Sequence, residues 1–384
     1  MREVDYLIVG AGFAGLVSAE RLCRQHKKTC LVVEKRGHIG GNCYDRLDEH
    51  GVRIHAYGPH YFRTNSETVL QYLSQFTEWI PGNYRVLCKT EGKYWSFPVN
   101  LETFEQYLGR PSSTAEMEAW LEENRIPFDE VTNSEEAVLS RFGPQFYKLF
   151  FEGYTLKQWQ RPPRDLAPSV CNRIPLRTNR DARYLSEKYQ VLPKEGYTAL
   201  FENLISSCGD KLEIRLNTDY REILPAVKFK HMIYTGPIDA YFDHCYGPLP
   251  YRSLRFSFEH LPAEALPGDP QTHTPPGFFQ PAVQVNYPGT EPWTRIVEIK
   301  HITGQQVAGT TLAREFPEPY AHGKEPYYPI LCPETHALYQ QYKQKADQLD
   351  HVTFLGRLGT YTYLNMDQVV SMALSTVEKL IHGI

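Results

Sequence analysis

The stretch "DYLIVGAGFAGLVSAERLCRQHKKTCLVVEKRGHIGGN", residues 5–42, determines the fold class. A short apolar segment comes first, and Gly10, Gly12 and Gly15 follow it with G-x-G-x-x-G spacing. A helical pattern comes next, and a second apolar segment, "TCLVVE", ends at Glu34. This strand–helix–strand order, with an acid at the end of the second strand, is typical of a Rossmann dinucleotide-binding unit. We therefore predict an α/β fold that opens with a dinucleotide site.

The glycines have separate roles in such a site. Gly10 allows the tight turn from strand to helix, Gly12 lets the backbone approach a pyrophosphate, and Gly15 lets the helix pack closely on the strand. The pyrophosphate is expected at the N-terminus of the helix, where free N–H groups and the helix dipole favour anions. We expect cofactor contacts at Phe13 and Ala14 there.

The residues around the end of the second strand distinguish between NAD and FAD. Glu34 is placed to accept hydrogen bonds from ribose hydroxyls, and "EKRGHIGGN" continues from it. The segments "YTG" and "FLGRLG" repeat the strand-then-glycine pattern later in the chain. This layout resembles the glutathione-reductase-like FAD proteins. The resemblance implies that Arg36, Gly41 and Asn42 lie along the FAD phosphates and ribityl chain, with Lys35 beside them.

The remaining chain suggests two insertions into the dinucleotide unit. The pattern is helical from Leu101 to about Arg141, with breaks at Pro111, Pro127 and Gly143, and residues 251–300 alternate as antiparallel strands do. We therefore predict a discontinuous Rossmann-like FAD-binding domain with an inserted α-helical domain and an antiparallel β-sheet domain. The expected boundaries are 1–78, 192–237 and 328–384 for the FAD-binding domain, 101–191 for the helical substrate domain with a mobile loop, and 79–100 and 238–327 for the sheet domain.

Composition limits the partners and the location. The net charge of −4 over 384 residues gives no reason to expect a nucleic-acid partner. No run approaches the roughly 18 apolar residues of a membrane helix, so no membrane insertion is expected. The eight cysteines are scattered without a CxxC pair and indicate reduced thiols in the cytoplasm. His55 and His60 have no third ligand nearby, so we expect no metal site.

Longer motifs extend over nearly the whole chain. They include "DYLIVGAGFAG", "YGPHYF", "GYTLKQW", "RIPLR", "YTGPID", "EPWTRIVEIKH", "PYYPI" and "GRLGTYTYLNMD". With these motifs the chain resembles the prokaryotic UDP-galactopyranose mutases. The resemblance implies a redox-neutral isomerase that interconverts UDP-galactopyranose and UDP-galactofuranose. Its FAD would act in the reduced form, through a covalent adduct between flavin N5 and the sugar. We also predict a homodimer.

The resemblance assigns the substrate residues. Arg173 and Arg295 match the arginines that hold the diphosphate, and guanidinium groups suit phosphate oxygens. Trp159 matches a tryptophan on the mobile substrate loop, Gln106 is a weaker candidate for the uracil, and Asn286 is placed among the substrate contacts. The diphosphate tyrosines would be Tyr154, Tyr184, Tyr328 and Tyr363. The uracil pocket would comprise Phe150, Tyr154 and Thr155.

The flavin residues follow from the same resemblance. Arg357 and Met366 match C-terminal FAD contacts, and His60 matches the histidine beside the isoalloxazine. The predicted catalytic set is Arg173, Arg295, Tyr328, Tyr363, His60 and Arg63.

Three positions depart from the family pattern. Arg63 stands where histidine is usual, Asn365 stands where aspartate is usual, and Glu195 stands where a second glycine is common. Arg63 either faces the sugar, where its reach would favour an acceptor such as an N-acetyl carbonyl, or turns outward or contacts phosphate. The substrate alternatives are therefore UDP-N-acetylgalactosamine and a deoxy or epimeric hexose on another nucleotide.

Two other functional classes stay open at this stage. One is an FAD-dependent oxidase of a small amine or alcohol on the same fold, and the other is a flavoprotein that only binds nucleotide sugars. The arginine and tyrosine set discriminates, because an oxidase of apolar amines has no use for it.

Overall fold

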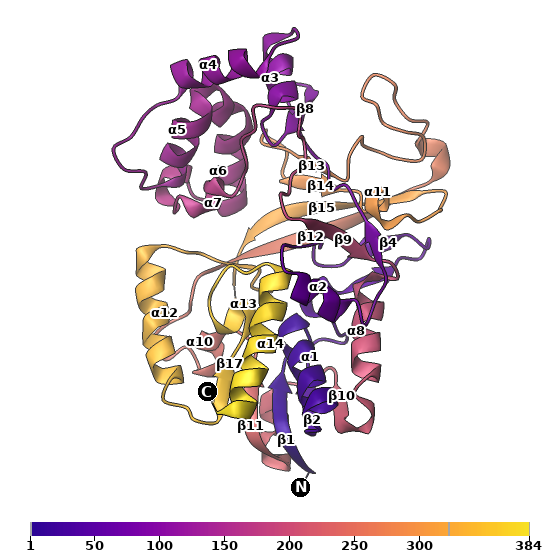
Figure 1. The fold of residues 1–384 in the computed structure, drawn as a ribbon, viewed down its shortest axis with the longest axis vertical. Helices are drawn as coiled ribbons and strands as arrows, with labels where there is room; N and C mark the ends of the chain where they lie inside the picture. The colour runs from indigo at the N-terminus through magenta and orange to yellow at the C-terminus, as the bar shows by residue number, and fades with distance from the viewer. Residues whose placement is uncertain (1, 322, 384) are drawn as a thin grey trace.

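The computed structural model describes residues 2–321 and 323–383 and has three parts (Figure 1). A helical part lies at the top of the view, and long antiparallel strands cross the middle. A part built on a parallel sheet lies below and carries both chain termini. The chain passes between these parts several times.

The lower part contains a five-stranded parallel sheet in the order β10-β2-β1-β11-β17. Its central strand is buried because both faces are covered; Leu7 and Ile8 have no exposed surface. Sequence-distant segments thus close one sheet, which confirms the predicted Rossmann-like architecture. The strands are β1 (Arg2–Val9), β2 (Cys30–Val33), β10 (Leu212–Arg215), β11 (Val227–Tyr234) and β17 (Val352–Phe354).

Helices from three regions of the chain cover this sheet. The helix α1 (Phe13–Glu20) follows β1 and packs against α8 (Gly196–Ser206) and α14 (Met366–His382). A π-helical turn over Arg21–Gln25 extends α1, as the pattern up to His26 predicts. Shorter or peripheral helices are α2 (Glu67–Leu73), α9 (Tyr220–Ile223), α10 (Ile238–Tyr241), α12 (Pro333–Ala346) and α13 (Gly356–Gly359).

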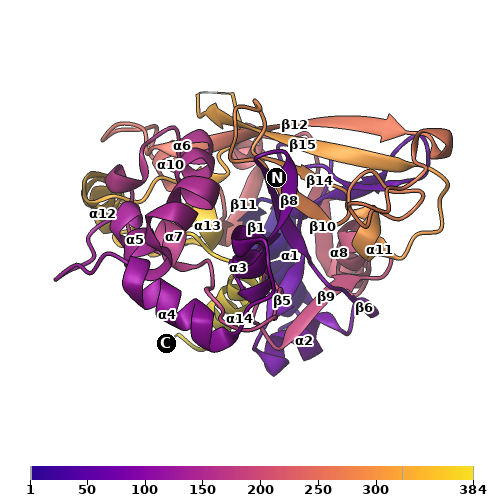
Figure 2. The same cartoon turned by 90° about the horizontal axis from the view of Figure 1, so that it is seen from above.

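The middle part is a seven-stranded sheet in the order β16-β12-β15-β14-β13-β7-β8, antiparallel except between β13 and β7. Its longest pair, β12 with β15, spans one side of the molecule in Figure 2. The strands β7 and β8 form a hairpin, with Glu91 and Gly92 at positive φ in its two-residue turn. The strands are β7 (Val86–Thr90), β8 (Lys93–Phe97), β12 (Tyr251–Leu261), β13 (Gln284–Asn286), β14 (Arg295–Val297), β15 (Thr310–Pro319) and β16 (Tyr328–Pro329).

The prediction of strands throughout 251–300 is wrong between β12 and β13. Residues 262–283 form a long connection with one 3₁₀ turn, and the helix α11 (Lys300–Thr303) ends the region. The connection contains six prolines, which cannot donate to a strand ladder.

The helical part confirms the predicted breaks. Its helices are capped by Asn100, Ser113 and Asn133, whose side chains accept backbone N–H groups. Pro111 lies between two of the helices, and Gly143, with φ of 76°, kinks a third. The helices are α3 (Leu101–Leu108), α4 (Thr114–Asn124), α5 (Ser134–Phe146), α6 (Gly153–Trp159) and α7 (Ser169–Asn172), with a π-helical segment at Tyr147–Glu152.

Two small sheets connect the parts. One is β3 (Asp45–Leu47) with β4 (Arg53–His55). The other places β9 (Tyr189–Pro193) between β5 (Phe62–Thr64) and β6 (Trp79–Pro81). The domain boundaries stay predictions. At one of them, β16 pairs with β12 of the middle sheet, although the sequence assigns residue 328 to the FAD-binding domain.

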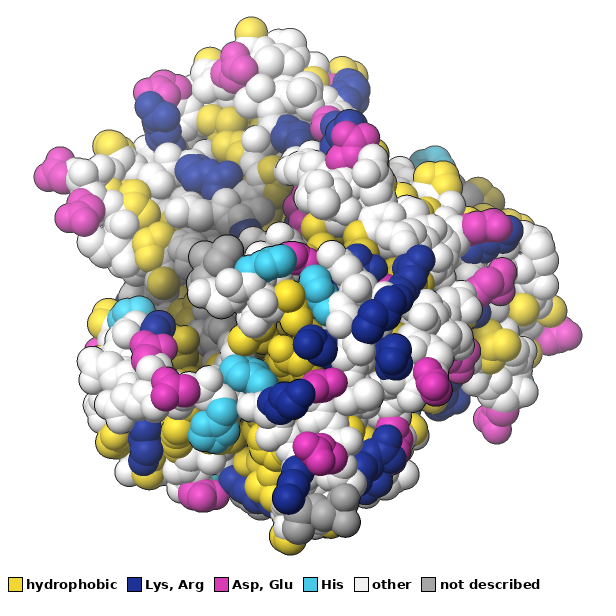
Figure 3. All heavy atoms as spheres, turned by 60° about the horizontal axis from the view of Figure 1, so that its bottom comes forward, with side chains coloured by type: hydrophobic (Ala, Val, Ile, Leu, Met, Phe, Trp, Pro, Cys, Tyr) yellow, Lys and Arg dark blue, Asp and Glu magenta, His cyan; other side chains and the backbone are white. Residues whose placement is uncertain are grey.

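One face of the molecule carries charged side chains of both signs. On the face in Figure 3, Lys and Arg side chains are interspersed with Asp and Glu side chains. Among the described residues, no helix combines the length and the apolar character needed to cross a membrane.

Candidate active site

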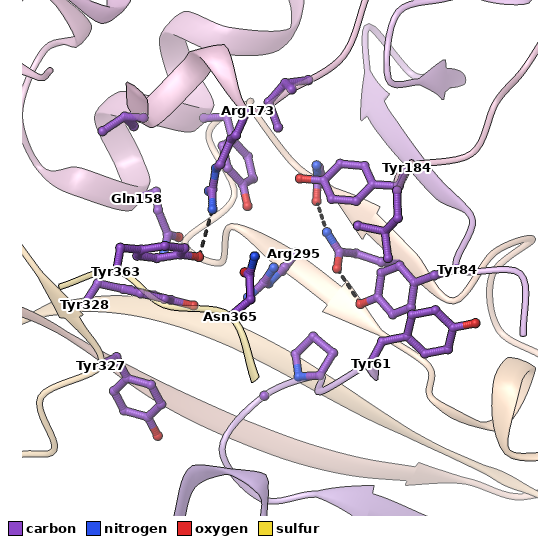
Figure 4. Close-up of a pocket in the computed structure, with 18 of the residues that line it drawn as sticks. Tyr61, Tyr84, Gln158, Arg173, Tyr184, Arg295, Tyr327, Tyr328, Tyr363 and Asn365 are labelled. Atoms are coloured by element: carbon purple, nitrogen blue, oxygen red, sulfur yellow. Dashed lines mark hydrogen bonds between the residues drawn. The ribbon is translucent and has the colours of Figure 1, made fainter. Parts of the chain in front are cut away.

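A cavity of about 240 Å³ lies where the three parts meet (Figure 4). It brings together residues from helices, strands and loops that are far apart in sequence. Of the predicted substrate residues, the cavity is lined by Phe150, Tyr154, Thr155, Trp159, Arg173, Tyr184, Asn286, Arg295, Tyr328, Tyr363 and Asn365. Of the other predicted residues, it is lined by Asn42, His60, Arg63, Arg357 and Met366.

Arg295 projects from β14 toward the middle of the cavity and is held by a buried carboxylate. Its Nε and Nη2 atoms donate to Glu315 Oε2 over 2.8 and 2.5 Å. Glu315 is directly opposite Arg295 in the β14–β15 ladder, and Thr294 Oγ1 donates to its other oxygen. Glu315 is fully buried, so it fixes the direction of the guanidinium while Arg295 keeps donors free for a ligand.

A second arginine approaches from the helical part. Arg173 follows α7, and its Nη1 donates to the Tyr363 hydroxyl over 2.8 Å. The rings of Tyr363 and Tyr328 stack with centroids 5.6 Å apart, and Arg357 lies over both rings. Arg173 is exposed to solvent in the cleft, so a substrate anion can reach it.

The arginines alter the acidity of the two stacked tyrosines. Burial raises the pKa of Tyr328 to about 12. Burial also acts to raise the pKa of Tyr363, but Arg173 and Arg357 outweigh it, and the pKa is lowered from its usual value. Both phenols therefore lie in a strongly positive field, which suits contact with an anionic ligand.

One face of α6 supplies four side chains to the cavity. Tyr154, Thr155, Gln158 and Trp159 have i, i+1, i+4, i+5 spacing and line it together. Gln158 was not among the predicted residues, although its spacing from Tyr154 places it on the same face of the helix. Gln158 is buried, and its Oε1 atom has no hydrogen-bond partner among the described residues.

The helical side of the cavity is aromatic. Phe150 packs against Trp95 and Phe97 with centroids 5.6 and 5.9 Å apart, and Tyr184 lies near Phe97. Such a wall suits a planar base. Gln106 does not line the cavity, because its amide is used on the backbone of residues 94 and 96.

A series of hydrogen bonds between three polar side chains lies on the opposite wall. The Tyr84 hydroxyl donates to Gln284 Oε1, and Gln284 Nε2 donates to Asn286 Oδ1. The bond from Gln284 uses the amide oxygen of Asn286 and leaves the amide nitrogen of Asn286 available to a ligand.

The two unusual residues Arg63 and Asn365 contact each other. Arg63 Nη2 donates to Asn365 Oδ1 over 3.1 Å, and its Nη1 donates to Glu187 over 2.7 Å. Both Arg63 and Asn365 line the cavity, so Arg63 does not turn outward in this structure. The third departure, Glu195, does not line it and precedes α8.

The histidines near the cavity are neutral. His55 Nδ1 accepts the backbone N–H of His60, and His60 Nδ1 lies 2.8 Å from the Gly58 carbonyl. Burial lowers the pKa of His55 to about 4 and that of His60 to about 3. The carbonyl contact requires a proton on His60 Nδ1, which leaves Nε2 as an acceptor.

The glycine loop forms a cradle that side chains would fill. A Cβ on Gly15 would lie 1.9 Å from the Gly10 carbonyl oxygen, and one on Gly41 would lie 3.1 Å from the Gly12 Cα. Gly12 is the N-cap of α1 and offers no side chain. Glu34 is buried and accepts the N–H groups of residues 11 and 36, so it also fixes this loop. A dinucleotide diphosphate therefore fits at this helix N-terminus.

The neighbouring basic residues connect the cradle to the middle part. Arg36 donates to Asn42 Oδ1 and pairs with Glu325 at 2.5 Å, while Lys35 is exposed and lies 3.6 Å from Glu325. Arg36 also lies 4.5 Å from the centre of the Tyr57 ring. Asn42 lines the main cavity and directly follows Gly41, which packs on Gly12, so the glycine cradle and the cavity are adjacent.

Among residues 2–321 and 323–383, no group of three His, Cys, Asp or Glu side chains could hold a metal ion. All eight cysteines are free thiols.

Comparisons with known proteins agree with this geometry. The family model "UDP-galactopyranose mutase" matches residues 149–363, and the model "NAD(P)-binding Rossmann-like domain" matches residues 8–76. A probable UDP-galactopyranose mutase of Klebsiella pneumoniae is 35% identical, with 100% of this chain and 96% of that protein covered. A dTDP-fucopyranose mutase of Escherichia coli is 32% identical, with 97% of each covered. A crystal structure of reduced UDP-galactopyranose mutase superimposes with a TM-score of 0.76 at 17% identity, over 99% of this chain and 94% of that one.

Proposed function

The chain belongs to the UDP-galactopyranose mutase family, and from that premise we propose that it interconverts the pyranose and furanose forms of a nucleotide-linked hexose. The enzyme is an isomerase, and its cofactor is FAD. UDP-galactose is the first substrate candidate. The observation that carries the proposal is the cluster of Arg173, Arg295, Tyr328 and Tyr363 around one cavity.

This cluster suits a departing diphosphate. When the bond from the anomeric carbon to the nucleoside diphosphate breaks, negative charge develops on the leaving oxygen. Arg295 is fixed by Glu315 and Arg173 by Tyr363, so their donors are oriented before the charge appears. The same cations hold the diphosphate close until the ring has changed form and the bond is restored.

Reduced FAD supplies, when bound, a nucleophilic N5 atom for covalent catalysis at the anomeric carbon. The neutral His60 offers Nε2 as a hydrogen-bond acceptor beside the expected flavin position, without adding charge. The aromatic wall around Phe150 excludes water from the base end of the cavity. The residues of this chain therefore bind, orient and shield, and none is needed as a redox group.

A second substrate has a specific argument in its favour. The chain is nearly as similar to the dTDP-fucopyranose mutase as to the probable UDP-galactopyranose mutase. The substituted pair Arg63 and Asn365 also lies at the cavity. A deoxyhexose on thymidine diphosphate is therefore the alternative that we propose to test beside UDP-galactose.

The test is conversion of nucleotide furanoses by the protein reduced with dithionite. UDP-galactofuranose, dTDP-fucofuranose and UDP-N-acetylgalactosamine in its furanose form are incubated separately, and the pyranoses are measured by chromatography. We expect one of them to be converted at least ~10-fold more efficiently than the others. If none is converted by protein that retains FAD, the proposed function is wrong.

Membership of the mutase family excludes oxidation of an amine or alcohol as the main activity. The homodimer and the cytoplasmic location stay predictions. Light scattering and analytical sedimentation measure the oligomeric state.

A further inference from the structure

Arg252 is a buried cation without an acid partner. It lies in β12 and is 4% exposed, and no described carboxylate pairs with it. Burial lowers the pKa of its guanidinium. A buried charge of this kind is costly unless hydrogen bonds compensate for it. Its hydrogen bonds therefore indicate what the residue does.

The side chain of Arg252 holds the end of α6. Its Nε donates to the Gln158 carbonyl oxygen over 3.2 Å, and its Nη1 donates to Gln160 Oε1 over 3.0 Å. Gln160 is the C-cap of α6 and has a left-handed conformation with φ of 52°. A cation at a helix C-terminus satisfies unpaired carbonyls and complements the helix dipole.

The backbone of Arg252 holds the opposite wall of the cavity. Its carbonyl accepts the N–H of Tyr327, and it is the ladder partner of Tyr328. Trp159, at the end of α6, lies 6.4 Å from Tyr328 between ring centroids. One residue thus sets the relative position of two side chains that face the cavity from different parts of the molecule.

Other contacts place α6 but do not involve Gln158 or Gln160. Lys157 donates to the carbonyls of Tyr287 and Trp293, and a Cβ on Gly153 would meet the Pro288 carbonyl oxygen at 2.3 Å. These contacts hold the start of α6 and, through Lys157, its last turn against the loop after β13. They do not involve Gln158 or Gln160, and the segment beyond Gln160 enters a run of prolines, so the side chain of Arg252 holds the C-terminal end of α6 at these two residues.

We propose that Arg252 is a positioning residue that fixes Gln158 and Trp159 against Tyr328 and thereby forms the nucleotide-binding end of the cavity. Arg252 itself does not line the cavity, so it acts through these residues. The inference rests on the proposed function, because it concerns the nucleotide of that substrate.

The experiment measures nucleotide affinity, not turnover. UDP and dTDP are titrated by calorimetry into the FAD-loaded wild type, and the tighter one is used for the variants Arg252→Met, Arg252→Lys and Gln160→Asn. The matched control is Arg255→Met: Arg255 lies in the same strand, is exposed and pairs with Glu318. FAD content and the melting temperature are measured for each variant.

We expect Kd to rise at least ~10-fold for Arg252→Met and to change less than ~2-fold for Arg255→Met. Arg252→Lys and Gln160→Asn should fall between them, because each keeps part of the contact. The melting temperature of Arg252→Met should not fall, since the variant replaces an unpaired buried charge with an apolar group.

Two results would overturn the proposal separately from the function. An unchanged Kd for Arg252→Met removes the positioning role. A lower melting temperature with an unchanged Kd shows that Arg252 is structural only. If the wild type binds neither nucleotide, the proposed function itself fails.

Discussion

At the scale of single residues, Arg173 and Arg295, which we propose to hold the diphosphate, give the clearest prediction. Arg173 contacts only Tyr363 by hydrogen bond, so Arg173→Ala removes a cation without leaving a buried charge unpaired. Because charge develops on the leaving diphosphate, we expect kcat/KM to fall ~10²–10³-fold, or about 3–4 kcal/mol. Steady-state kinetics with reduced protein measure it, and the flavin absorbance should stay normal.

The matched control is Arg180→Ala, because Arg180 is exposed in the same part and pairs with Glu105. Arg295 needs a different design. Its removal alone would strand the buried Glu315, so Arg295→Met is combined with Glu315→Gln. If Arg173→Ala and this double variant both retain wild-type turnover, the substrate lies elsewhere.

The contact between Arg63 and Asn365 gives a prediction about the sugar. Relative to a histidine and aspartate pair, this pair changes the local charge from negative to positive. A charge-assisted hydrogen bond is worth roughly 1.5–3 kcal/mol, so Arg63→His should change the preference between UDP-N-acetylgalactosamine and UDP-galactose by ~10–100-fold. The ratio of the two kcat/KM values measures it, with Asn365→Asp tested in parallel. An unchanged ratio in both variants would remove this pair from substrate selection.

His55 gives a pH prediction. It is 4% exposed, and its Nδ1 already accepts the N–H of His60, so protonation there would cost that bond. Its pKa of about 4 lies below the ordinary value of 6.5, so the unfolded chain takes up the proton first as the pH falls. The contribution of neutral His55 to the free energy of unfolding is complete above about pH 6.5 and is lost toward pH 4. Between pH 7 and pH 5 this loss is about 2 kcal/mol.

The measurement is urea unfolding of the wild type and His55→Asn at pH 7 and pH 5. Asparagine offers an acceptor but does not titrate. The wild type should lose about 2 kcal/mol more than the variant, and equal losses would show that His55 is not the group responsible.

The sequence predicted cavity residues where they belong to one continuous motif. It did not predict residues that reach the cavity or its neighbours only through strand pairing or contacts distant in sequence. The "GYTLKQW" segment led to Tyr154, Thr155 and Trp159, which line the cavity. Glu315 could not be found, because only the β14–β15 register places it opposite Arg295. Glu187 and Arg252 were missed for the same reason, since their partners lie more than 90 residues away.

At the scale of elements, the segment between α6 and α7 is the expected mobile loop. It contains Pro162, Pro163 and Pro168, yet the backbone N–H of Ser134 donates to Leu166, and the Ser134 hydroxyl donates to Ala167. These contacts and the Arg252 contact hold both ends. We therefore expect motion to concentrate in residues 161–165.

Limited proteolysis measures this motion. Trypsin cuts poorly before proline, so Arg164 and not Arg161 is the useful site. Saturating nucleotide should slow cleavage after Arg164 at least ~5-fold, because closure of the loop excludes protease as well as water. Cleavage after Arg46, an exposed side chain outside the cavity, is the control. Equal rates with and without nucleotide at Arg164 would contradict a closing loop.

Element types followed the sequence patterns where periodicity is strong, as in α1, α3 and α4. The pattern misled over residues 262–283, because alternating apolar residues occur there among prolines that prevent a ladder. The order of the strands in the sheets could not be predicted from the sequence. The parallel pairing of β13 with β7 joins residues about 200 apart, and no local pattern specifies it.

At the scale of the whole molecule, the cavity exists only because three parts converge. The parallel-sheet part brings the glycine cradle, the middle sheet brings Arg295 and Tyr328, and the helical part brings Phe150 and Arg173. We therefore expect the FAD and the nucleotide sugar to meet at a junction between the parts, because no single part lines the whole cavity. This arrangement is common for ligand sites and explains why the substrate arginines are far apart in sequence.

The redox state of the whole enzyme gives the last prediction. An isomerase returns every electron pair that it uses, whereas an oxidase consumes one reductant or oxidant equivalent per turnover. Since only reduced flavin offers a nucleophilic N5, the oxidised protein should convert less than ~1% of the nucleotide furanose that the reduced protein converts in the same time. Anaerobic assays after a single addition of dithionite test this, with the flavin absorbance recorded throughout. Many turnovers should occur while the flavin stays reduced. Stoichiometric reoxidation of the flavin with product would instead indicate electron transfer to the substrate and contradict a redox-neutral mutase.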